Sequence, residues 1–398
     1  MKQNCRPAAK DVLEHLQGKQ DDLISLLRRM TEAESPSDVP GAQHEIREII
    51  AMGLERLGYS VKRIPGKVSG GMLHARPANR LPDQPAQLLL GHYDTVWPLG
   101  TLDEMPFEHD QDVVRGPGVY DMKGGVAQAI LAIGALRDFG FEPAVTPHIF
   151  LNSDEEIGSR ESRRYIESLA PHMNRVLVLE PSLGPAGMLK TARKGIGRFT
   201  VTVQGEAAHA GLDPGAGASA ILELSHVIQA LFALNDLDRG ITVNVGTIDG
   251  GLRPNVVAPK STAVVDVRVE SQADADLIGA VIRSLEPAIE GTSLLIEGEF
   301  GRPAMERTAA NRGLWQLACR LGDELGLELE QGLAGGGSDG NFTSRHTATL
   351  DGLGAVGDGA HARHEHLRLG PTLERAALLA LLLMAPPLEP HHPLNGDA

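Results

Sequence analysis

Cysteine is scarce in this chain, and long apolar runs are missing. Only Cys5 and Cys319 occur among the 398 residues, which excludes a disulfide framework and a cysteine-ligated metal site. The most apolar late stretch, residues 376–385, is far shorter than the roughly 20 residues that a membrane span needs. Residues 1–20 are polar and contain no apolar signal-peptide core. These absences predict a soluble, cytoplasmic protein.

Positive charge is also in short supply. The chain has 37 Lys and Arg residues against 52 Asp and Glu residues, giving a formal net charge of −15 at pH 7. This balance argues against nucleic acid and anionic membranes as partners. Apolar residues make up 42% of the chain, which is ample for a packed core, and the length predicts two or more domains.

The first half of the chain alternates between helical and strand-like patterns. Helices are expected within 11–57 and at 124–139 and 159–168. Strands are expected at 60–64, 88–90, 148–152 and 176–179. This alternation is typical of an α/β domain with a mostly parallel sheet flanked by helices. Ligands of such domains bind at the carboxyl ends of the strands.

A different pattern begins near residue 194. Its expected elements run strand, helix, strand, strand, helix, strand, at 198–203, 216–234, 241–248, 262–269, 274–289 and 293–297. That order matches the split βαβ, ferredoxin-like arrangement. The α/β character then returns with a helix at 311–325, a strand at 348–350 and a helix from Pro371. We therefore expect a catalytic domain built from 1–193 and 304–398, interrupted by an inserted α+β domain at 194–303.

The segment GHYDTV, residues 91–96, follows the apolar run 88–90 and contains a candidate metal ligand. Side chains alternate across a strand, so His92 and Asp94 can point the same way. Asp94 can then accept a hydrogen bond from the second ring nitrogen of a metal-bound His92. A single His at a strand end is also compatible with an ordinary polar role, so the other motifs decide.

Four further segments offer carboxylates or imidazoles. They are RGPGVYDMKGG with Asp121, SDEEIG with residues 154–156, LEPS with Glu180, and HARHEH with His361, His364 and His366. Each alone is compatible with a helix cap, a solvated acidic loop, a strand end or a surface cluster. Three successive carboxylates repel one another, however, and a cation relieves that repulsion. The set can provide two His, two terminal Glu, a bridging Asp and a spare carboxylate as base, which suits two zinc ions.

Together these motifs resemble the di-zinc metallopeptidase family that includes glutamate carboxypeptidase, acetylornithine deacetylase, succinyl-diaminopimelate desuccinylase and aminoacylase. The resemblance spans nearly the whole chain. It is strongest to the glutamate carboxypeptidases, in GHYDTVWPLGTL, PFEHD, RGPGVYDMKGG, SDEEIGS, LEPS, AAHAG, GRPA, GGGSDGNF and HARHE. It implies two Zn²⁺ per subunit, with Co²⁺ or Mn²⁺ as substitutes.

The resemblance implies a role for each motif residue. The implied metal ligands are His92 and Glu180 on one zinc, Glu156 and His361 on the other, and Asp121 bridging both. Glu155 is then the general base, and Asp94 orients His92. His361 is preferred over His364 and His366 because His361 and Glu365 meet the family spacing H-x-x-x-E.

The resemblance also implies that the inserted domain acts as a lid and forms a homodimer. His209, in GEAAHAG, matches a histidine that reaches the other subunit's active site and helps hold the substrate carbonyl. Asn255 and Arg268 match positions that contact substrate. Arg268 has an alternative role, in which it pairs with Asp266 or Glu270 on a sheet face.

The glycine-rich loop 335–340, which includes Gly336 and Gly337, can present backbone N–H groups to a substrate carboxylate. An alternative phosphate-binding role is disfavoured, because GGGSDG matches neither G-x-G-x-x-G nor G-x-x-x-x-G-K-[ST]. A non-catalytic relative is disfavoured because every implied ligand and the base are present.

The implied activity is zinc-dependent hydrolysis of an amide next to a carboxylate. A glutamate-carboxypeptidase-like release of a C-terminal amino acid is the main prediction. An N-acyl-amino-acid deacylase or desuccinylase using the same site is the alternative, and the sequence does not separate the two.

Overall fold

A computed structural model describes residues 6–80 and 83–389 of the chain. The chain forms two compact units, which are treated separately below. Unit 1 comprises Met1–Thr191, Arg307–Leu333 and Ser338–Ala398, and unit 2 comprises Ala192–Glu306 with Ala334–Gly337. Among the described residues, no helix has the length and apolar character to cross a membrane.

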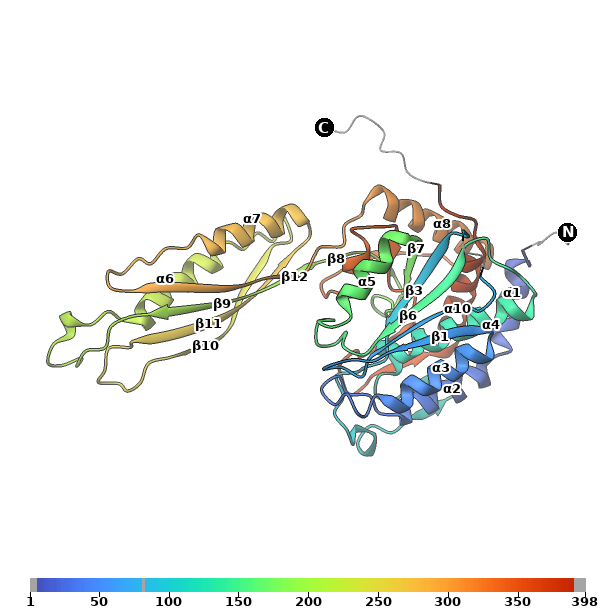
Figure 1. The fold of residues 1–398 in the computed structure, drawn as a ribbon, viewed down its shortest axis with the longest axis horizontal. Helices are drawn as coiled ribbons and strands as arrows, with labels where there is room; N and C mark the ends of the chain where they lie inside the picture. Colours follow the sequence, from blue (N-terminus) through green and yellow to red (C-terminus); the bar gives the residue numbers. More distant parts are fainter. Residues whose placement is uncertain (1–5, 81–82, 390–398) are drawn as a thin grey trace. The chain divides into compact units, whose positions relative to one another are not determined.

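Unit 1 is built on a six-stranded sheet with the strand order β1-β2-β6-β3-β7-β14 (Figure 1). The strands are β1 (Tyr59–Ile64), β2 (Met72–Pro77), β6 (Thr146–Asn152), β3 (Ala86–His92), β7 (Met173–Val178) and β14 (Thr349–Leu350). Strands β6, β3, β7 and β14 run parallel to one another, whereas β2 is antiparallel to both of its neighbours, β1 and β6. This confirms the predicted mostly parallel sheet.

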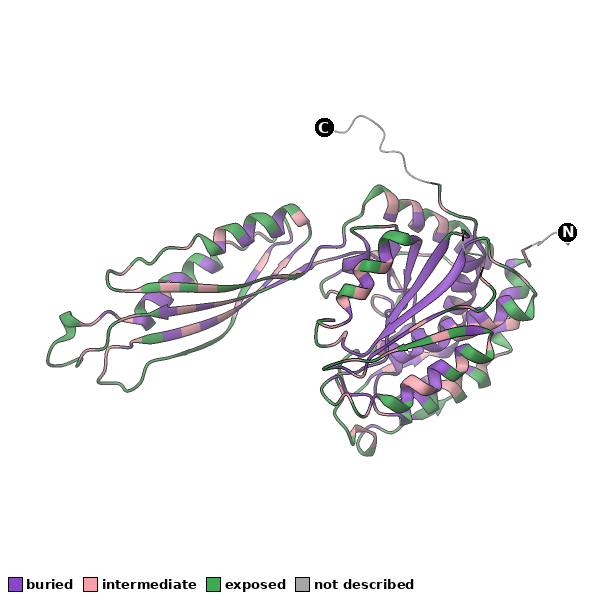
Figure 2. Cartoon of the chain, viewed as in Figure 1, coloured by how far each residue is buried: buried purple, intermediate pink, exposed green. Residues whose placement is uncertain are grey.

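The central strands are buried on both faces. Every residue of β3 and β6 is buried (Figure 2). Alternate side chains enter two separate cores: Leu89 contributes to one, and Leu88 and Leu90 contribute to the other. Continuous apolar runs such as 88–90 arise because both sheet faces are covered by helices.

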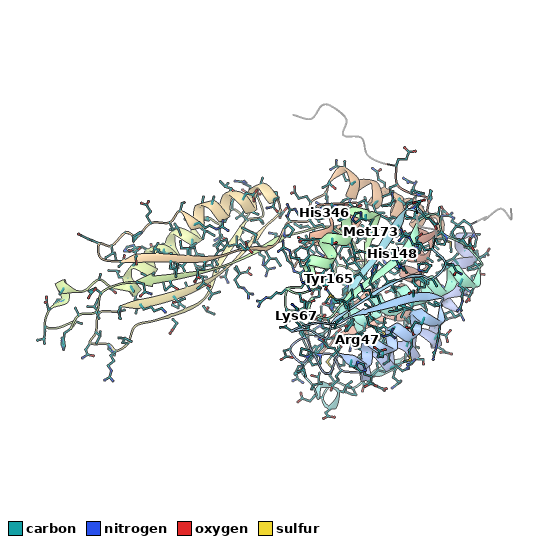
Figure 3. All side chains as sticks on the ribbon, in the orientation of Figure 1. Arg47, Lys67, His148, Tyr165, Met173 and His346 are labelled. Carbon is teal, nitrogen blue, oxygen red and sulfur yellow. The ribbon has the colours of Figure 1, made fainter. Side chains whose placement is uncertain are left out.

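The helices of unit 1 cover the two faces unequally. They are α1 (Ala9–Gln17), α2 (Gln20–Glu32), α3 (His44–Arg56), α4 (Gly124–Asp138), α5 (Arg163–Leu169), α8 (Ala309–Leu325), α9 (Gly340–Thr343) and α10 (Leu369–Met384). Residues of α1, α3, α4, α8 and α10 pack into the core on one face. The other face is covered by α5 and α9, and its core includes Phe150 and Met173, with His148 on the same strand as Phe150 (Figure 3).

Smaller elements complete unit 1, and two of them, β8 and β13, end in residues of unit 2. A four-stranded antiparallel sheet has the order β15-β16-β5-β4, and β13 pairs with β8. These strands are β4 (Glu108–Asp110), β5 (Val113–Arg115), β8 (Leu189–Arg193), β13 (Gln331–Ala334), β15 (Gly357–Asp358) and β16 (His366–Arg368). The short helical turns are η1 (Thr101–Asp103), η2 (Val119–Lys123) and η3 (Ala170–His172).

Unit 2 is an antiparallel sheet with two helices on one face. Its elements are β9 (Gly195–Gln204), η4 (Pro214–Ala216), α6 (Ala220–Phe232), β10 (Thr242–Gly250), β11 (Lys260–Val269), α7 (Gln272–Arg283) and β12 (Ser293–Arg302). The strand order is β10-β11-β9-β12, and each neighbouring pair is antiparallel. This topology confirms the predicted ferredoxin-like fold. Alternating residues of β9 and β11 are buried beneath the helices, as a one-sided core requires.

Candidate metal centre

Three neighbouring parallel strands of unit 1 end at one edge of the sheet. His92 is the last residue of β3, Glu156 follows the end of β6, and Glu180 follows the end of β7. Carboxyl ends of parallel strands meet at the same edge, so residues far apart in sequence come together there. Asp121 reaches the same place from η2, just before α4.

Two groups of potential metal ligands share Asp121. One contains His92, Asp121 and Glu180, the other contains Asp121, Glu156 and His361, and the ligand atoms of each group lie within 4.8 Å of one another. His92 Nε2 is 3.4 Å from Asp121 Oδ1 and 3.5 Å from Glu180 Oε1. His361 Nε2 is 3.4 Å from Asp121 Oδ2 and 3.0 Å from Glu156 Oε2. Each oxygen of Asp121 therefore faces a different histidine.

The donor set fits a pair of divalent cations. Among the described residues, the buried acceptors Asp121 Oδ1 and Glu156 Oε1 receive no hydrogen bond of good geometry, and His92 Nε2 makes only an ion-pair contact with Asp121 Oδ1 at 3.4 Å. Burial, followed by the charge of Asp121, raises the pKa of Glu156 to about 7 overall, although His361 opposes the shift. Hydrogen bonds to Asp121 and Glu156 raise the pKa of His361 to about 10. Carboxylates crowded in this way favour any positive charge between them, and Asp, Glu and His are ligands that zinc accepts.

The backbone of His361 adopts a left-handed conformation with φ 60°. This conformation is uncommon for residues other than glycine and is found preferentially at functional sites. Of the three histidines in HARHEH, His361 is the one that belongs to a ligand group. His364 is exposed, and His366 Nδ1 lies 2.9 Å from the backbone oxygen of His364.

Asp94 is buried beside His92, and its carboxylate also binds neighbouring backbone N–H groups. His92 Nδ1 lies 3.0 Å from the backbone oxygen of Asp94 and 3.4 Å from its Oδ1. The carboxylate also accepts the backbone N–H groups of Glu155 (3.3 Å, Oδ1) and Glu156 (3.2 Å, Oδ2) and the hydroxyl of Ser37 (2.7 Å, Oδ2). The ring nitrogen Nδ1 of His92 is thus closer to the backbone carbonyl of Asp94 than to its carboxylate.

Glu155 belongs to neither ligand group, although it directly precedes Glu156. Its backbone N–H is held by Asp94 at the same strand-end edge. The position suits a carboxylate that acts beside the ligands rather than as one of them.

In unit 2, the structure places His209 next to Asn255. Ala210 N donates to Asn255 O at 3.0 Å, and His209 forms a β-bridge with Val256. His209 Nδ1 accepts the backbone N–H groups of Gly211 (3.1 Å) and Leu212 (3.2 Å). An accepting Nδ1 assigns the proton of the neutral imidazole to Nε2, which leaves Nε2–H as a donor on an exposed side chain.

Arg268 lies near the C-terminal end of β11. It pairs with Asp266, which is the alternative role given for it in the sequence analysis. Its Nε and Nη2 donate to Asp266 Oδ1 (2.7 Å) and Oδ2 (3.1 Å), and its Nη1 lies 3.4 Å from Gly335 O. Gly336 and Gly337 also belong to unit 2, and their carbonyls accept bonds from Arg193 at 3.1 and 3.2 Å. The Nε and Nη2 side of the Arg268 guanidinium is thus already bound to Asp266.

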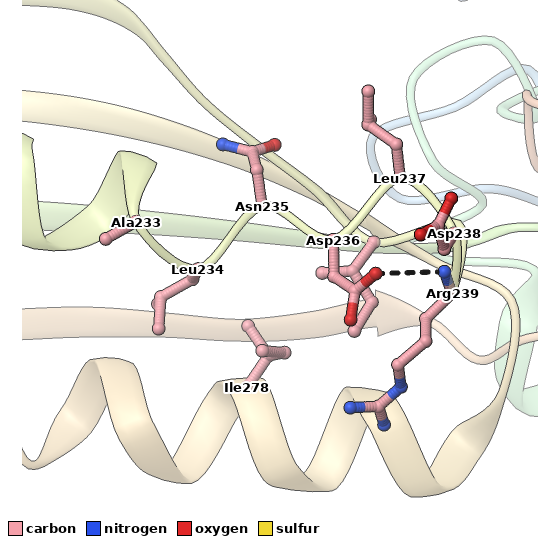
Figure 4. Close-up of a pocket in the computed structure, with 9 residues that line it drawn as sticks. Ala233, Leu234, Asn235, Asp236, Leu237, Asp238, Arg239 and Ile278 are labelled. Atoms are coloured by element: carbon pink, nitrogen blue, oxygen red, sulfur yellow. Dashed lines mark hydrogen bonds between the residues drawn. The ribbon is translucent and has the colours of Figure 1, made fainter.

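Two cavities lie away from these residues. One of about 460 Å³ in unit 2 is lined by residues 233–239, Ile241 and Ile278, where Arg239 N donates to Asp236 Oδ1 at 3.1 Å (Figure 4). The other, of about 490 Å³ in unit 1, lies between the starts of β1 and β6 and includes Tyr59 and Thr146 in its lining. Neither cavity contains a residue that the sequence singled out.

Sequence reasoning gave no role to Ser37 or Trp97 and used Glu365 only as a spacing marker. Ser37 donates to Asp94, and Trp97 Nε1 donates to Glu365 at 2.7 Å. Their partners are 57 and 268 residues away along the chain. The four-residue spacing between His361 and Glu365 was the one signal that pointed to any of them.

Two overlapping carboxylate–histidine groups at the strand ends of an α/β unit define a metallohydrolase-type centre. The family model described as Peptidase family M20/M25/M40 matches residues 88–385. The chain belongs to this family and is a hydrolase.

Curated proteins similar to this chain include two hydrolases of different specificity. Carboxypeptidase G2 from Pseudomonas sp. (strain RS-16) is 28% identical over 348 residues, which cover 83% of this chain and 81% of that protein. Succinyl-diaminopimelate desuccinylase from Rhodospirillum centenum is 27% identical over 383 residues, which cover 91% of this chain and 96% of that protein.

Solved structures support the fold assignment. Aminopeptidase PepT from Bacillus cereus ATCC 10987 superposes with a TM-score of 0.76 at 20% identity, covering 92% of this chain and 98% of that one. The M20 family metallo-carboxypeptidase Sso-CP2 from Sulfolobus solfataricus gives a TM-score of 0.68 at 17% identity, with the same coverage of both chains. At such identities the similarity shows the fold.

Proposed function

We propose that this protein is a di-zinc exopeptidase of the glutamate-carboxypeptidase type, which releases a C-terminal amino acid from its substrate. The observation that carries the proposal is the pair of ligand groups sharing Asp121, one with His92 and Glu180 and the other with Glu156 and His361. Each group offers three protein ligands, which leaves coordination positions for water and substrate.

Two bound cations in such a site lower the pKa of a shared water and polarise the scissile carbonyl. The chain's own residues supply the proton transfers. Glu155 takes the proton of the attacking water and returns it to the departing amine. Asp94 keeps Glu155 in place by accepting its backbone N–H. His209 donates from Nε2 to the oxyanion that develops on the carbonyl.

We also propose a cytoplasmic homodimer formed through unit 2, approximately residues 194–303. Strand β10 is an edge strand of the unit 2 sheet. Near it lie exposed apolar side chains: Ile248 is 66% exposed, Leu252 is 72% exposed and Ile221 is 49% exposed. An unpaired strand edge with exposed apolar residues favours pairing with another chain.

The arrangement within unit 2 supports a shared active site. Arg268 lies near the end of β11 opposite Lys260, and the β9–β11 ladder continues past Lys260 through Gly205–Pro259 to His209–Val256. At about 3.3 Å per residue, His209 and Arg268 are at least roughly 25 Å apart. Two residues so far apart cannot contact one small substrate within a single chain. Under the proposal, His209 and Asn255 serve the partner's site.

The alternative function is N-acyl-amino-acid deacylation, including desuccinylation. The similarity to a desuccinylase over nearly the whole chain favours keeping it. Both reactions cleave an amide next to a carboxylate and use the same ligands and base, so the centre described above serves either.

The deciding experiment combines metal analysis with a substrate panel. Purified protein loaded with zinc is assayed on folyl-glutamate, on dipeptides and on N-acyl amino acids, including N-succinyl amino acids. The proposal expects about two zinc ions per chain and the highest kcat/KM on a substrate with a C-terminal amino acid. Highest kcat/KM on an N-succinyl substrate supports the alternative, and a protein that binds no zinc contradicts both.

A further inference from the structure

The carboxylate of Glu365 is buried beside the candidate metal centre and accepts several hydrogen bonds. Glu365 is 1% exposed and lies four residues after His361, on the far side of a tight turn. It is not a member of either ligand group. A buried carboxylate is costly unless it is fully hydrogen-bonded, so its partners indicate what it does.

Four N–H donors surround this carboxylate, two for each oxygen. Oε1 accepts the backbone N–H groups of Tyr120 (2.9 Å) and Asp121 (3.0 Å). Oε2 accepts the indole N–H of Trp97 (2.7 Å) and the backbone N–H of Gly118 (2.9 Å). The carboxylate therefore binds backbone N–H groups on both sides of Val119. One of them belongs to Asp121, whose side chain is shared by the two ligand groups.

The backbone of residues 118–121 needs such an external partner. Gly118 has φ 75°, and a Cβ at this position would lie 2.5 Å from Thr95 Cγ2, so the turn is tightly enclosed. Asp121 has non-helical φ and ψ within η2, and its N–H donates to Glu365 rather than to a helix carbonyl. The direction of the Asp121 side chain depends on this turn.

We propose that Glu365 is a positioning residue for metal binding, assisted by Trp97. Glu365 fixes the backbone of Asp121, so that the two side-chain oxygens of Asp121 face His92 and His361. It also links two of the three ligands of the second group, Asp121 and His361, because the turn that bears His361 leads directly into Glu365. The inference rests on the proposed dinuclear centre and assigns a cause to its geometry.

The test substitutes Glu365 and measures zinc affinity by competition with a chromophoric chelator. In Glu365→Gln, the amide NH₂ must face one of the two pairs of N–H donors. The variant therefore cannot accept all four hydrogen bonds. We expect at least one zinc to bind about 10- to 100-fold more weakly than in the parent. Trp97→Phe removes a single donor, and we expect a loss of about threefold to tenfold.

The double variant separates positioning from general damage. Both substitutions act on the same carboxylate, so the loss in Trp97→Phe/Glu365→Gln should be smaller than the product of the two single losses. Trp315→Phe, at a partly buried position of α8 that packs against the core of unit 1, should bind zinc like the parent.

Glu223→Gln is the matched control for Glu365→Gln. Glu223 is also 1% exposed and accepts the backbone N–H groups of Ala288 and Ile289, but it lies in unit 2. We expect it to lower thermal stability and leave zinc affinity unchanged.

Parent-like binding of two zinc ions by Glu365→Gln would overturn the inference alone, as would an equal loss in Glu223→Gln. A parent protein that binds no zinc would overturn the proposed function and this inference with it. If Glu365→Gln does not fold, Trp97→Phe against Trp315→Phe decides the question, and equal affinities in those two variants would overturn the inference.

Discussion

Asp94 accepts the backbone N–H of Glu156 on Oδ2 at 3.2 Å, which ties the end of β3 to the loop after β6. The loop bearing a candidate ligand is thus held through its backbone, and Asp94 holds the backbone of Glu155 in the same way. A change confined to the Glu155 side chain should therefore leave the loop in place.

We expect Glu155→Gln to retain near-normal zinc while activity falls by about 10²- to 10⁴-fold, because a general base is lost and no ligand is. Asp121→Ala should lose both activity and metal, since it removes a ligand from each group. Metal analysis of the purified variants, alongside steady-state assays, checks both statements. Loss of one zinc from Glu155→Gln would show that the roles of Glu155 and Glu156 are exchanged.

We expect two inactive variants to restore activity when their subunits are mixed. His209→Ala lacks the donor offered to the partner's site, and Glu155→Gln lacks the base of its own site. A mixed dimer contains one site with both residues intact, so random exchange should recover up to about a quarter of parent activity. Light scattering gives the oligomeric state. An active monomer, or no recovery after verified subunit exchange, contradicts the shared site.

The pair formed by His148 and His74 should make the protein less stable in acid. His74 Nε2 lies 3.2 Å from His148 Nδ1, and His148 is 4% exposed. Burial, together with the charges of His74, Arg80 and Arg76, lowers the pKa of His148 from 6.5 to about 4. The unfolded chain therefore binds more protons between these values, so stability falls as pH decreases from about 6.5 to about 4, by up to about 3 kcal/mol from this group.

Urea unfolding of the parent and of His148→Phe between pH 4 and pH 7.5 measures this effect. The variant should show a shallower loss of stability with acid, because it has one fewer buried group to protonate. His109→Asn, at an exposed position on β4, should keep the parent slope. Identical slopes in His148→Phe and the parent would contradict the assignment.

The parts of the fold that sequence patterns predicted are those dominated by local burial. Residues 88–90 read as a buried strand because both faces of β3 are covered. The predicted helix at 159–168 begins instead at Arg163. The physical reason is a side-chain contact that hydrophobic periodicity does not register: the carboxylate of Asp154 accepts the N–H groups of Glu161 and Ser162, which holds residues before α5 in a turn.

The small sheet β15-β16-β5-β4 was not predicted, because its strands have two or three residues and β16 pairs with a strand some 250 residues earlier. At the site, the ligand residue types followed from motifs. The residues that hydrogen-bond to the ligands' backbone could not be predicted in this way. Asp94 and Glu365 accept backbone N–H groups, which nearly every residue has, so no motif marks the pairing. For Arg268, the alternative pairing with Asp266 is the one that the structure contains.

Arg175 should be a large contributor to the stability of unit 1. It is fully buried, and its guanidinium donates to Gln87 Oε1, Ala385 O and Pro386 O, each at 2.8 Å. We expect Arg175→Met to lower the free energy of unfolding by roughly 2–4 kcal/mol, because three acceptors lose their donor and two of these hydrogen bonds are buried. Arg320→Met, at an exposed position on α8, should change it by less than about 0.5 kcal/mol. Urea unfolding of both variants decides, and equal stabilities would contradict the prediction.

The last prediction concerns the substrate carboxylate. We propose that Arg268, with Asn255 of the partner subunit and the loop containing Gly336 and Gly337, anchors a free carboxylate next to the scissile amide. A guanidinium meets a carboxylate through a planar fork that Lys cannot reproduce. Arg268→Lys should therefore raise KM and lower kcat/KM sharply, since placement of the amide depends on that anchor.

Asp266→Asn separates the anchor from the pairing already present. If Arg268 serves only to pair with Asp266, the two variants should have the same kinetic defect. If it anchors substrate, Asp266→Asn should leave KM near the parent value, while Arg268→Lys does not. The parent should also cleave a carboxamide analogue poorly, and Arg268→Lys should lose little further on it, because that analogue never used the anchor. Equal cleavage of carboxylate and carboxamide substrates by the parent would remove the anchor hypothesis, together with the preference for substrates that carry a free carboxylate beside the amide.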